Sequence, residues 1–370
     1  MKNTDLSEKL RFHLRLKKLA SKLDVSGKEA ALITHEKNIF YLTDFKNSEG
    51  TLFVTRDKAY FLVDFRYGEA VKNSVTNCEV VVYSKYYEAL TEIVKRHEIK
   101  EIITETESIT VRRFEKLKKE FSESGCELSN NDTLDKLLTN LRIVKSSEEI
   151  RKIKQAQKIT EEAFTELLNF VKIGAVERDL ALELEFLMRK KGASGVSFDL
   201  ITIAGKNTSK PHGVPGDYAI QNGDFVTFDI GAIYEGYHSD MTRTLAVGQV
   251  SDFQREIYNI VYKAQTAAVS AVKTGVKASY VDKVARDIIT EYGYGECFGH
   301  STGHGVGLDI HEQPFVSTRT DVILSEGMII TVEPGIYIPD KFGVRIEDMG
   351  AVTSKGYDNF ASLPKELIVL

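Results

Sequence analysis

Short strand-like runs alternate with helical patterns through the first third of the chain, and this alternation restricts the fold more than any other feature. The runs are rich in β-branched and aromatic residues and lie at 30–33, 51–54, 60–63, 79–82 and 101–104. Residues 86–97 and 111–121 have the spacing of helices. A chain that alternates in this way is expected to build an α/β domain, in which helices pack on a sheet.

A different pattern begins near residue 146, where Ser146 is followed three residues later by Glu149. This pair is a capping-box signature for the start of a helix, whose apolar positions continue to Leu167. Further helices are expected at 177–190, 252–274 and 279–292. Strands are expected at 200–204, 225–230, 235–238, 242–246, 328–332, 335–338, 344–346 and 348–352. With roughly 100–200 residues per domain, the 370 residues predict two domains, 1–143 and 144–370.

Charge and cysteine content exclude several classes of protein. The net charge of −5 provides no basic excess for nucleic acid, and no run approaches the roughly 18 apolar residues that cross a bilayer. Cys78, Cys126 and Cys297 are far apart, and no CxxC pair occurs, so a disulfide framework is not expected. The first residues lack the apolar core and cleavage site of a secretory leader. We therefore expect a cytoplasmic protein without nucleic-acid or membrane partners.

Two aspartates flank a glycine-containing segment in the second half. Asp229 ends an apolar strand, and Asp240 directly precedes the next one, so a hairpin would bring their carboxylates together. Two like charges at short range repel, and a bound cation is the usual remedy. The alternative is that both are ordinary turn or capping aspartates, since aspartate favours turns.

Three histidines and two glutamates extend this pattern. His300, His304 and His311 are separated by glycines, which let the backbone approach a ligand closely. Glu333 ends an apolar strand. Arg345 and Glu347 are expected to share one face of another strand, where Arg345 could also pair with Glu347 in the absence of metal.

Four carboxylates and one imidazole from separate strand ends suit hard or borderline cations. Two such cations bridged by carboxylates form a hydrolytic centre, in which the metals polarise a carbonyl and activate water.

These residues lie in motifs that resemble the creatinase/prolidase/aminopeptidase P group of metallopeptidases, family M24B. The motifs are Asp229-Ile-Gly with Ser239-Asp-Met-Thr-Arg-Thr244, Gly303-His-Gly-Val-Gly-Leu308 with His311-Glu-Gln-Pro314, Val332-Glu-Pro-Gly-Ile-Tyr337, and Gly343-Val-Arg-Ile-Glu-Asp348. The resemblance implies a creatinase/prolidase-like α/β domain over 1–143 and a catalytic pita-bread α+β domain over 144–370.

The resemblance also implies roles for individual residues. Asp229 would bind one metal, His304 and Glu333 the other, and Asp240 and Glu347 would bridge the two. The implied cofactor is a pair of divalent ions, with Mn²⁺ favoured and Zn²⁺, Co²⁺ or Mg²⁺ as alternatives. The implied catalytic residues are His212, His300, His311, Glu333 as general base, and Arg345, which orients the bridging glutamate or the substrate.

The first half resembles the N-terminal domain of the same family. Asn38-Ile-Phe-Tyr-Leu-Thr43 is similar to its second-strand motif, and Asp64-Phe-Arg-Tyr67 to a motif of bacterial aminopeptidase P and prolidase members. Asp44 and Asn47 stand where glycine is expected. Because aspartate and asparagine adopt left-handed backbone most readily among the other residues, the turn is expected to survive.

The resulting prediction is an Xaa-Pro aminopeptidase that removes the residue before proline from peptides, with a prolidase restricted to dipeptides as the alternative. An amide to proline lacks the N–H on which extended-strand binding relies, so its hydrolysis needs a shaped pocket and strong polarisation of the carbonyl. A creatinase-like amidinohydrolase and a non-catalytic binding module are disfavoured, since both would be expected to lose ligands that this chain retains. The resemblance further implies a homodimer or a higher homo-oligomer.

Overall fold

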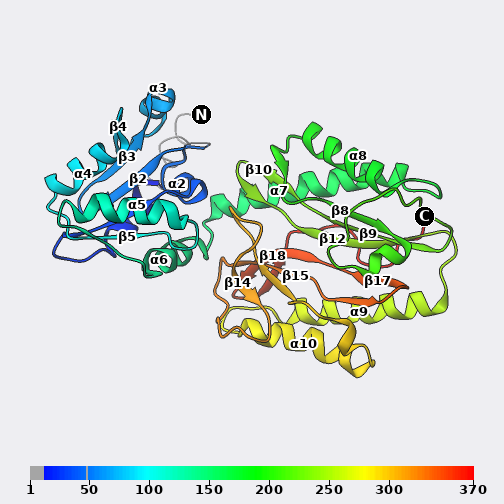
Figure 1. The fold of residues 1–370 in the computed structure, drawn as a ribbon. Coiled ribbons are helices and arrows are strands. Elements are labelled where there is room, and N and C mark those ends of the chain that lie inside the picture. The colour runs from blue at the N-terminus through cyan, green and yellow to red at the C-terminus, as the bar shows by residue number, and fades with distance from the viewer. Residues whose placement is uncertain (1–11, 47–48) are drawn as a thin grey trace. The chain divides into compact units, whose positions relative to one another are not determined.

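The computed structural model describes residues 12–46 and 49–370, which separate into two compact units between Arg142 and Ile143 (Figure 1). The two units are considered individually below. None of the helices among the described residues is both long and apolar enough to cross a bilayer.

The first unit is an α/β domain, as predicted, built on a six-stranded sheet of order β4-β3-β2-β1-β5-β6. Its strands are β1 (Glu29–Ile33), β2 (Thr51–Thr55), β3 (Ala59–Val63), β4 (Glu79–Val82), β5 (Glu101–Thr104) and β6 (Glu127–Leu128). Its helices include α2 (Glu36–Thr43), α3 (Phe65–Ser74), α4 (Tyr86–Arg96), α5 (Val111–Ser122) and α6 (Thr133–Arg142). The strands β1, β2 and β3 pair antiparallel, whereas β4, β5 and β6 join in parallel. Apolar residues of α4 and α5 pack on the sheet and close its core.

One expectation in this unit is wrong. Residues 38–43, assigned by resemblance to a strand motif, lie within helix α2, with Ile39, Phe40 and Leu42 buried. A short apolar run does not by itself distinguish a strand from a buried helical turn. The expected left-handed turn does follow: Asp44 has φ 63° and caps the helix by donating its N–H to the Phe40 carbonyl. Asn47 lies outside the described residues.

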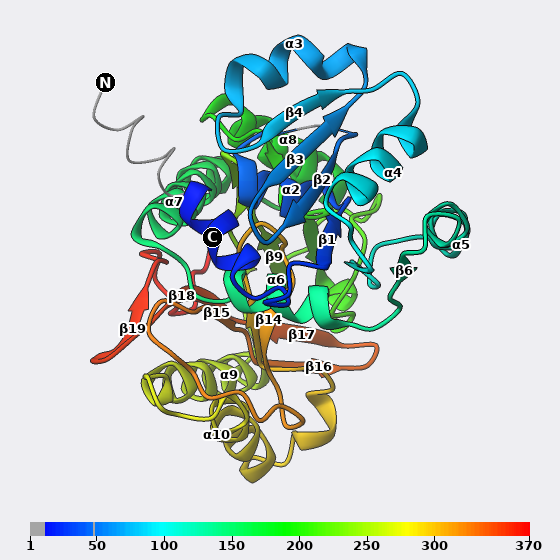
Figure 2. The same cartoon turned by 90° about the vertical axis from the view of Figure 1, so that its left-hand side faces the viewer.

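The second unit places strands between two helix pairs, the expected pita-bread arrangement (Figures 1 and 2). The helices are α7 (Ser147–Leu167), α8 (Glu177–Lys190), α9 (Asp252–Ala271) and α10 (Ala278–Glu291). The strands are β7 (Gly195–Val196), β8 (Ile201–Ala204), β9 (Asp224–Ile230), β10 (Ala232–Tyr234), β11 (Tyr237–His238), β12 (Met241–Val247), β13 (Gly303–Gly305), β14 (Glu312–Val316), β15 (Ile329–Val332), β16 (Gly335–Ile338), β17 (Phe342–Arg345), β18 (Asp348–Thr353) and β19 (Gly356–Asn359).

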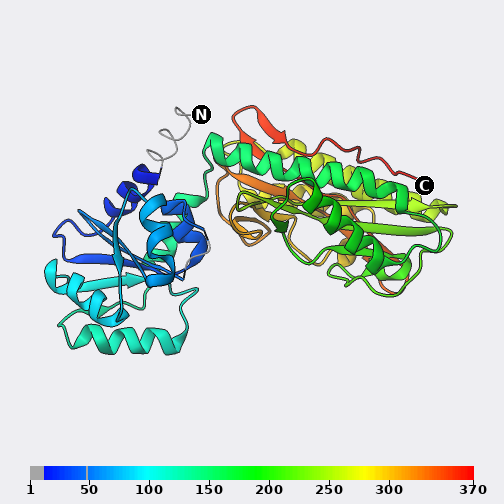
Figure 3. The same ribbon diagram turned by 90° about the horizontal axis from the view of Figure 1, so that it is seen from above.

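Each helix pair covers its own group of strands. Helices α7 and α8 lie beside each other along one face of the unit (Figure 3), and their apolar side chains pack against β8, β9 and β12. Those of α9 and α10 pack against β15, β16 and β17. The sheets have the orders β12-β9-β8, β11-β10-β7 and β14-β13-β15-β18-β19, and β16 and β17 form a separate hairpin. The ends of strands from both groups can therefore meet between the two helix pairs.

Local chemistry fixes where the long helices begin. Ser146 and Glu149 form the predicted capping box, in which each side chain accepts from the backbone of the other residue. Ser251 and Gln254 form a second one at the start of α9. Each cap satisfies two N–H groups that would otherwise lack partners at the end of the helix.

Candidate active site

The register of β9 and β12 brings Asp229 and Asp240 to the same end of the sheet. Thr242 faces Asp229 across the antiparallel pair, and Asp240 directly precedes β12. The intervening residues leave the sheet as the β10–β11 hairpin and return, which is possible because residue 231 is glycine. A Cβ at Gly231 would lie 2.0 Å from the Ser239 carbonyl oxygen, so only glycine fits this close approach.

His304 faces this pair from β13. Its backbone N–H donates to Thr331 Oγ1, and its Nδ1 lies 3.0 Å from the Gly305 carbonyl. A carbonyl partner favours a proton on Nδ1, and the lone pair of Nε2 is then available to bind a metal. That Nε2 lies 3.5 Å from Asp240 Oδ2 and 3.4 Å from Glu333 Oε1. The donor atoms therefore converge on one point.

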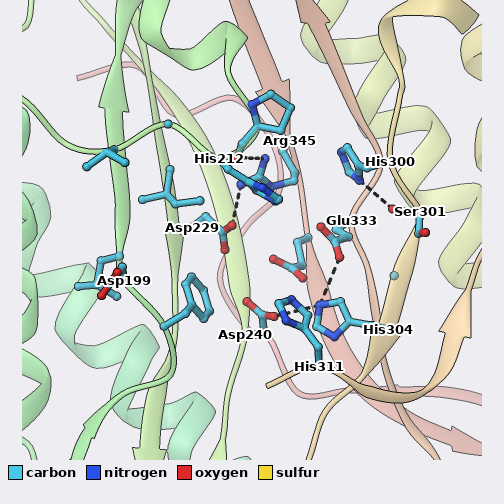
Figure 4. Close-up of a pocket in the computed structure, with 18 of the residues that line it drawn as sticks. Asp199, His212, Asp229, Asp240, His300, Ser301, His304, His311, Glu333 and Arg345 are labelled. Carbon is cyan, nitrogen blue, oxygen red and sulfur yellow. Dashed lines mark hydrogen bonds and ion pairs between the residues drawn. The ribbon is translucent and has the colours of Figure 1, made fainter. Parts of the chain in front are cut away.

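All the site residues expected from the sequence line one pocket of about 670 Å³, which belongs entirely to the second unit (Figure 4). They are His212, Asp229, Asp240, His300, His304, His311, Glu333, Arg345 and Glu347. The rings of His304 and His311 are in contact, with centroids 4.4 Å apart. The volume suits a short peptide or another small ligand.

Burial makes the charged form of the carboxylates unfavourable and so changes their pKa values. It is the main reason that the pKa of Asp240 and the pKa of Glu347 lie well above the ordinary values, and the neighbouring carboxylates raise both further. Burial likewise raises the pKa of Glu333 to about 7. It lowers the pKa of His304 to about 4, so this ring is neutral at physiological pH, the form that binds metals.

The donor set fits divalent cations. One oxygen or nitrogen from each of Asp240, His304 and Glu347 lies within 4.8 Å of the others. Asp229 Oδ1 is buried and has no hydrogen-bond partner among the described residues. A buried carboxylate oxygen left in this way calls for a cation or an ordered water. Oxygen ligands with a single imidazole suit Mn²⁺, Mg²⁺, Co²⁺ or Zn²⁺.

The structure does not contain the direct pair of Arg345 with Glu347 that the sequence allowed in the absence of metal. Arg345 Nη2 pairs with Asp229 Oδ2 at 2.6 Å, whereas Glu347 Oε2 accepts from the Thr242 hydroxyl at 2.8 Å. Glu347 is 1% exposed and forms no ion pair with any lysine or arginine in the described ranges. A buried carboxylate in this position needs either a bound cation or a proton.

Sequence reasoning missed two residues that organise the pocket. The Tyr337 hydroxyl accepts from Arg345 Nη1 at 2.7 Å and lies 2.9 Å from His300 Nε2. The Thr242 hydroxyl joins Arg345 Nε to Glu347. Both residues lie within the quoted motifs, but only the fold reveals their partners, which lie 8 to 105 residues away in the chain.

The metal-free protein is expected to lose stability as the pH rises. Because the pKa values of Asp240, Glu333 and Glu347 are raised by folding, the folded state holds protons that the unfolded chain has released. That contribution is complete below the ordinary carboxyl pKa and is lost as the pH rises through the folded value, about 7 for Glu333.

A bound cation replaces these protons, so Mn²⁺ should raise the Tm more at about pH 8 than at about pH 5. Thermal unfolding with and without Mn²⁺ measures this, and Glu347→Gln should flatten the metal-free slope. An equal Mn²⁺ effect at both pH values would contradict the assignment.

Comparisons with known proteins cover nearly the whole chain. Residues 15–144 match the creatinase/prolidase N-terminal domain, and residues 151–354 match metallopeptidase family M24. A protein named Xaa-Pro dipeptidase from Pyrococcus horikoshii is 38% identical over 359 residues, which cover 96% of this chain and 98% of that protein.

Solved structures show the same similarity. The structure of an Xaa-Pro dipeptidase from Bacillus anthracis superposes with a TM-score of 0.92 at 40% identity and covers 97% of this chain and 100% of that one. The structure of an X-Pro aminopeptidase from Thermotoga maritima has a TM-score of 0.85 at 36% identity and covers 93% of this chain and 98% of that one.

Proposed function

The chain belongs to metallopeptidase family M24, and from this premise we propose that it hydrolyses the bond between an N-terminal residue and proline, with Xaa-Pro dipeptides as its main substrates. The observation that carries the proposal is the convergence of four carboxylates and His304 at one pocket. The sequence favoured aminopeptidase P. The names of the Pyrococcus horikoshii and Bacillus anthracis proteins support the dipeptidase alternative instead.

We propose that Asp229 holds one divalent ion, that His304 and Glu333 hold the second, and that Asp240 and Glu347 bridge them, with Mn²⁺ as the preferred metal. When bound, the two ions would polarise the scissile carbonyl and lower the pKa of a water between them. The unpaired oxygen of Asp229 and the raised pKa values of the bridging pair support this assignment.

The remaining residues are proposed to handle protons and to orient the substrate. Glu333 takes the proton of the attacking water, because its carboxylate lines the same pocket as His212 and His311. His212 and His311 face the substrate and supply a proton to the leaving proline nitrogen. Arg345 fixes Asp229 directly and Glu347 through Thr242.

One feature of the pocket favours aminopeptidase P as the second candidate. A dipeptidase gains selectivity from a cation that receives the substrate's terminal carboxylate. Arg345 is the one lysine or arginine among the described residues that line the pocket. Its guanidinium already donates to Asp229, Thr242, Tyr337 and the Pro211 carbonyl. A longer peptide, whose carboxylate lies outside the pocket, requires no such cation.

Hydrolysis of Ala-Pro compared with Ala-Pro-Ala decides between the two candidates. We expect metal-stripped protein to be inactive and Mn²⁺ to restore cleavage of Ala-Pro, at a kcat/KM above that for Ala-Pro-Ala, as the dipeptidase names of the relatives lead us to expect. Efficient cleavage of both would establish aminopeptidase P. Cleavage of neither by protein with bound metal would refute the Xaa-Pro assignment.

A further inference from the structure

We propose that Glu177, the first residue of α8, is a positioning residue that fixes the loop carrying His212 into the pocket. This loop, residues 205–216, contains no metal ligand of the proposed centre. The effect of Glu177 on catalysis rests on the proposed function, because it acts through His212. The structural clamp itself does not depend on that function.

The Glu177 carboxylate holds both ends of the loop. Oε1 accepts from the Ala204 N–H at 2.6 Å and from Asn207 Nδ2 at 2.9 Å, while Oε2 accepts from the Gly216 N–H at 2.9 Å. The side chain is buried, with 1% exposure, and no lysine or arginine of the described chain pairs with it. A buried carboxylate satisfied by N–H donors alone forms strong hydrogen bonds and imposes their geometry.

The clamped loop forms one wall of the pocket. Pro211, His212 and the three residues after them line it. Figure 4 shows His212 beside Arg345 and Asp229. The Pro211 carbonyl accepts from Arg345 Nη1 at 3.2 Å, and the Thr208 hydroxyl accepts from the Gly343 N–H at 2.8 Å. The middle of the loop therefore contacts the site, and its two ends meet at Glu177.

The start of α8 does not require a carboxylate, because the other half of the second unit forms the same backbone hydrogen bonds before α10 without one. Before α8, Gly174 donates to Ile220, Ile220 to Ala175, and Glu177 to Tyr218 through backbone groups. Before α10, the corresponding backbone bonds run from Gly275 to Leu324, from Leu324 to Val276, and from Ala278 to Val322.

The position of Glu177 is thus occupied by Ala278 in the second half. In that half, residues 317–321 are all that separates the end of β14 from Val322, so the long loop and the carboxylate occur together in the first half.

Glu177→Gln tests the clamp with minimal change of shape. Its amide can still accept from Ala204 or Gly216, but its NH₂ group then faces the other donor, so one end of the loop is released. Glu105→Gln is the matched control. Glu105 is also 1% exposed and accepts from two backbone N–H groups, of Thr34 and His35, and from Asn38 Nδ2, all in the first unit.

The first readout is hydrogen exchange of peptides that contain the Ala204 and Gly216 amides. Exchange should accelerate by about tenfold or more in Glu177→Gln, as expected for loss of a clamp on a surface loop, and should not change in Glu105→Gln. The second readout is kcat/KM on Ala-Pro. Glu177→Gln should reduce it by about 10–100-fold, the range found for outer partners of functional residues. Mn²⁺ affinity should stay unchanged.

A double-mutant cycle separates positioning from general damage. In a His212→Ala background, Glu177→Gln should cost less than about threefold, because the residue that it positions is already absent. Unchanged exchange at Ala204 and Gly216, or an additive loss in the double mutant, would overturn the proposal. If the wild-type protein cleaves no Xaa-Pro substrate, the proposed function fails, and the exchange comparison alone then decides the clamp.

Discussion

Replacing Asp240 with asparagine is expected to abolish most Xaa-Pro hydrolysis while making the metal-free protein more stable. Asp240 is 4% exposed and belongs to the group with His304 and Glu347 that could hold a cation. Loss of a carboxylate proposed to bind metal would remove several kcal/mol of charge stabilisation, so kcat/KM should fall by about 10³-fold or more. Metal content should drop from two ions per chain to one or fewer.

The stability change distinguishes this explanation from simple damage. Burial and the nearby Glu347 and Asp229 raise the pKa of Asp240, so its charge is unfavourable when no cation is present. The neutral amide removes that repulsion, and the Tm of the stripped variant should exceed that of the stripped wild type at about pH 8.

Asp199→Asn is the control, because Asp199 lines the same pocket and is not one of the proposed metal ligands. It should leave metal content unchanged. A stripped Asp240→Asn protein that melts below the stripped wild type would contradict the assignment.

The sequence predicted most of the local structure because local chemistry determines it. The capping box at Ser146 marks the start of α7, and the apolar spacing over 177–190 matches α8 at both ends. Strand limits differ by one or two residues, as for β17, which ends at Arg345 instead of 346. Where the apolar run was too short to show a period, at residues 38–43, the pattern allowed either structure and the strand assignment was wrong.

The partners within the site could not be predicted in the same way. The sequence placed Arg345 and Glu347 on one face of a strand, which allowed a direct pair as an alternative to metal binding. This placement was wrong, because β17 ends at Arg345 and Glu347 lies before the start of β18. In the structure Arg345 instead donates to Asp229, 116 residues away in the chain, and Glu347 accepts from the Thr242 hydroxyl. The clamp at Glu177 is equally hidden, because its three donors lie 27 to 39 residues later in the chain. Such pairings depend on the register and on loop closure, which one sequence does not reveal.

Arg345→Lys is expected to reduce kcat/KM by about 10²-fold without unfolding the protein, the upper part of the range for residues that orient functional groups. Arg345 is 3% exposed and uses all three of its nitrogens: Nε on Thr242, Nη1 on Tyr337 and the Pro211 carbonyl, and Nη2 on Asp229. Lysine keeps the charge but offers a single ammonium, which can reach Asp229 or Tyr337 and cannot hold both with the guanidinium geometry.

The loss should fall mainly on kcat, because the proposed role of Arg345 is to hold the metal-binding carboxylates and the loop of His212 in place. Arg15→Lys in the first unit is the control: Arg15 is 6% exposed, donates from Nη1 to the Tyr41 carbonyl at 2.9 Å and lies over the Tyr41 ring. Both variants should lose stability, measured by thermal unfolding, since each replaces a buried guanidinium whose planar geometry an ammonium does not reproduce. Only Arg345→Lys should lose activity out of proportion to that stability change. Equal losses of kcat in the two variants would mean that Arg345 serves the fold and not the reaction.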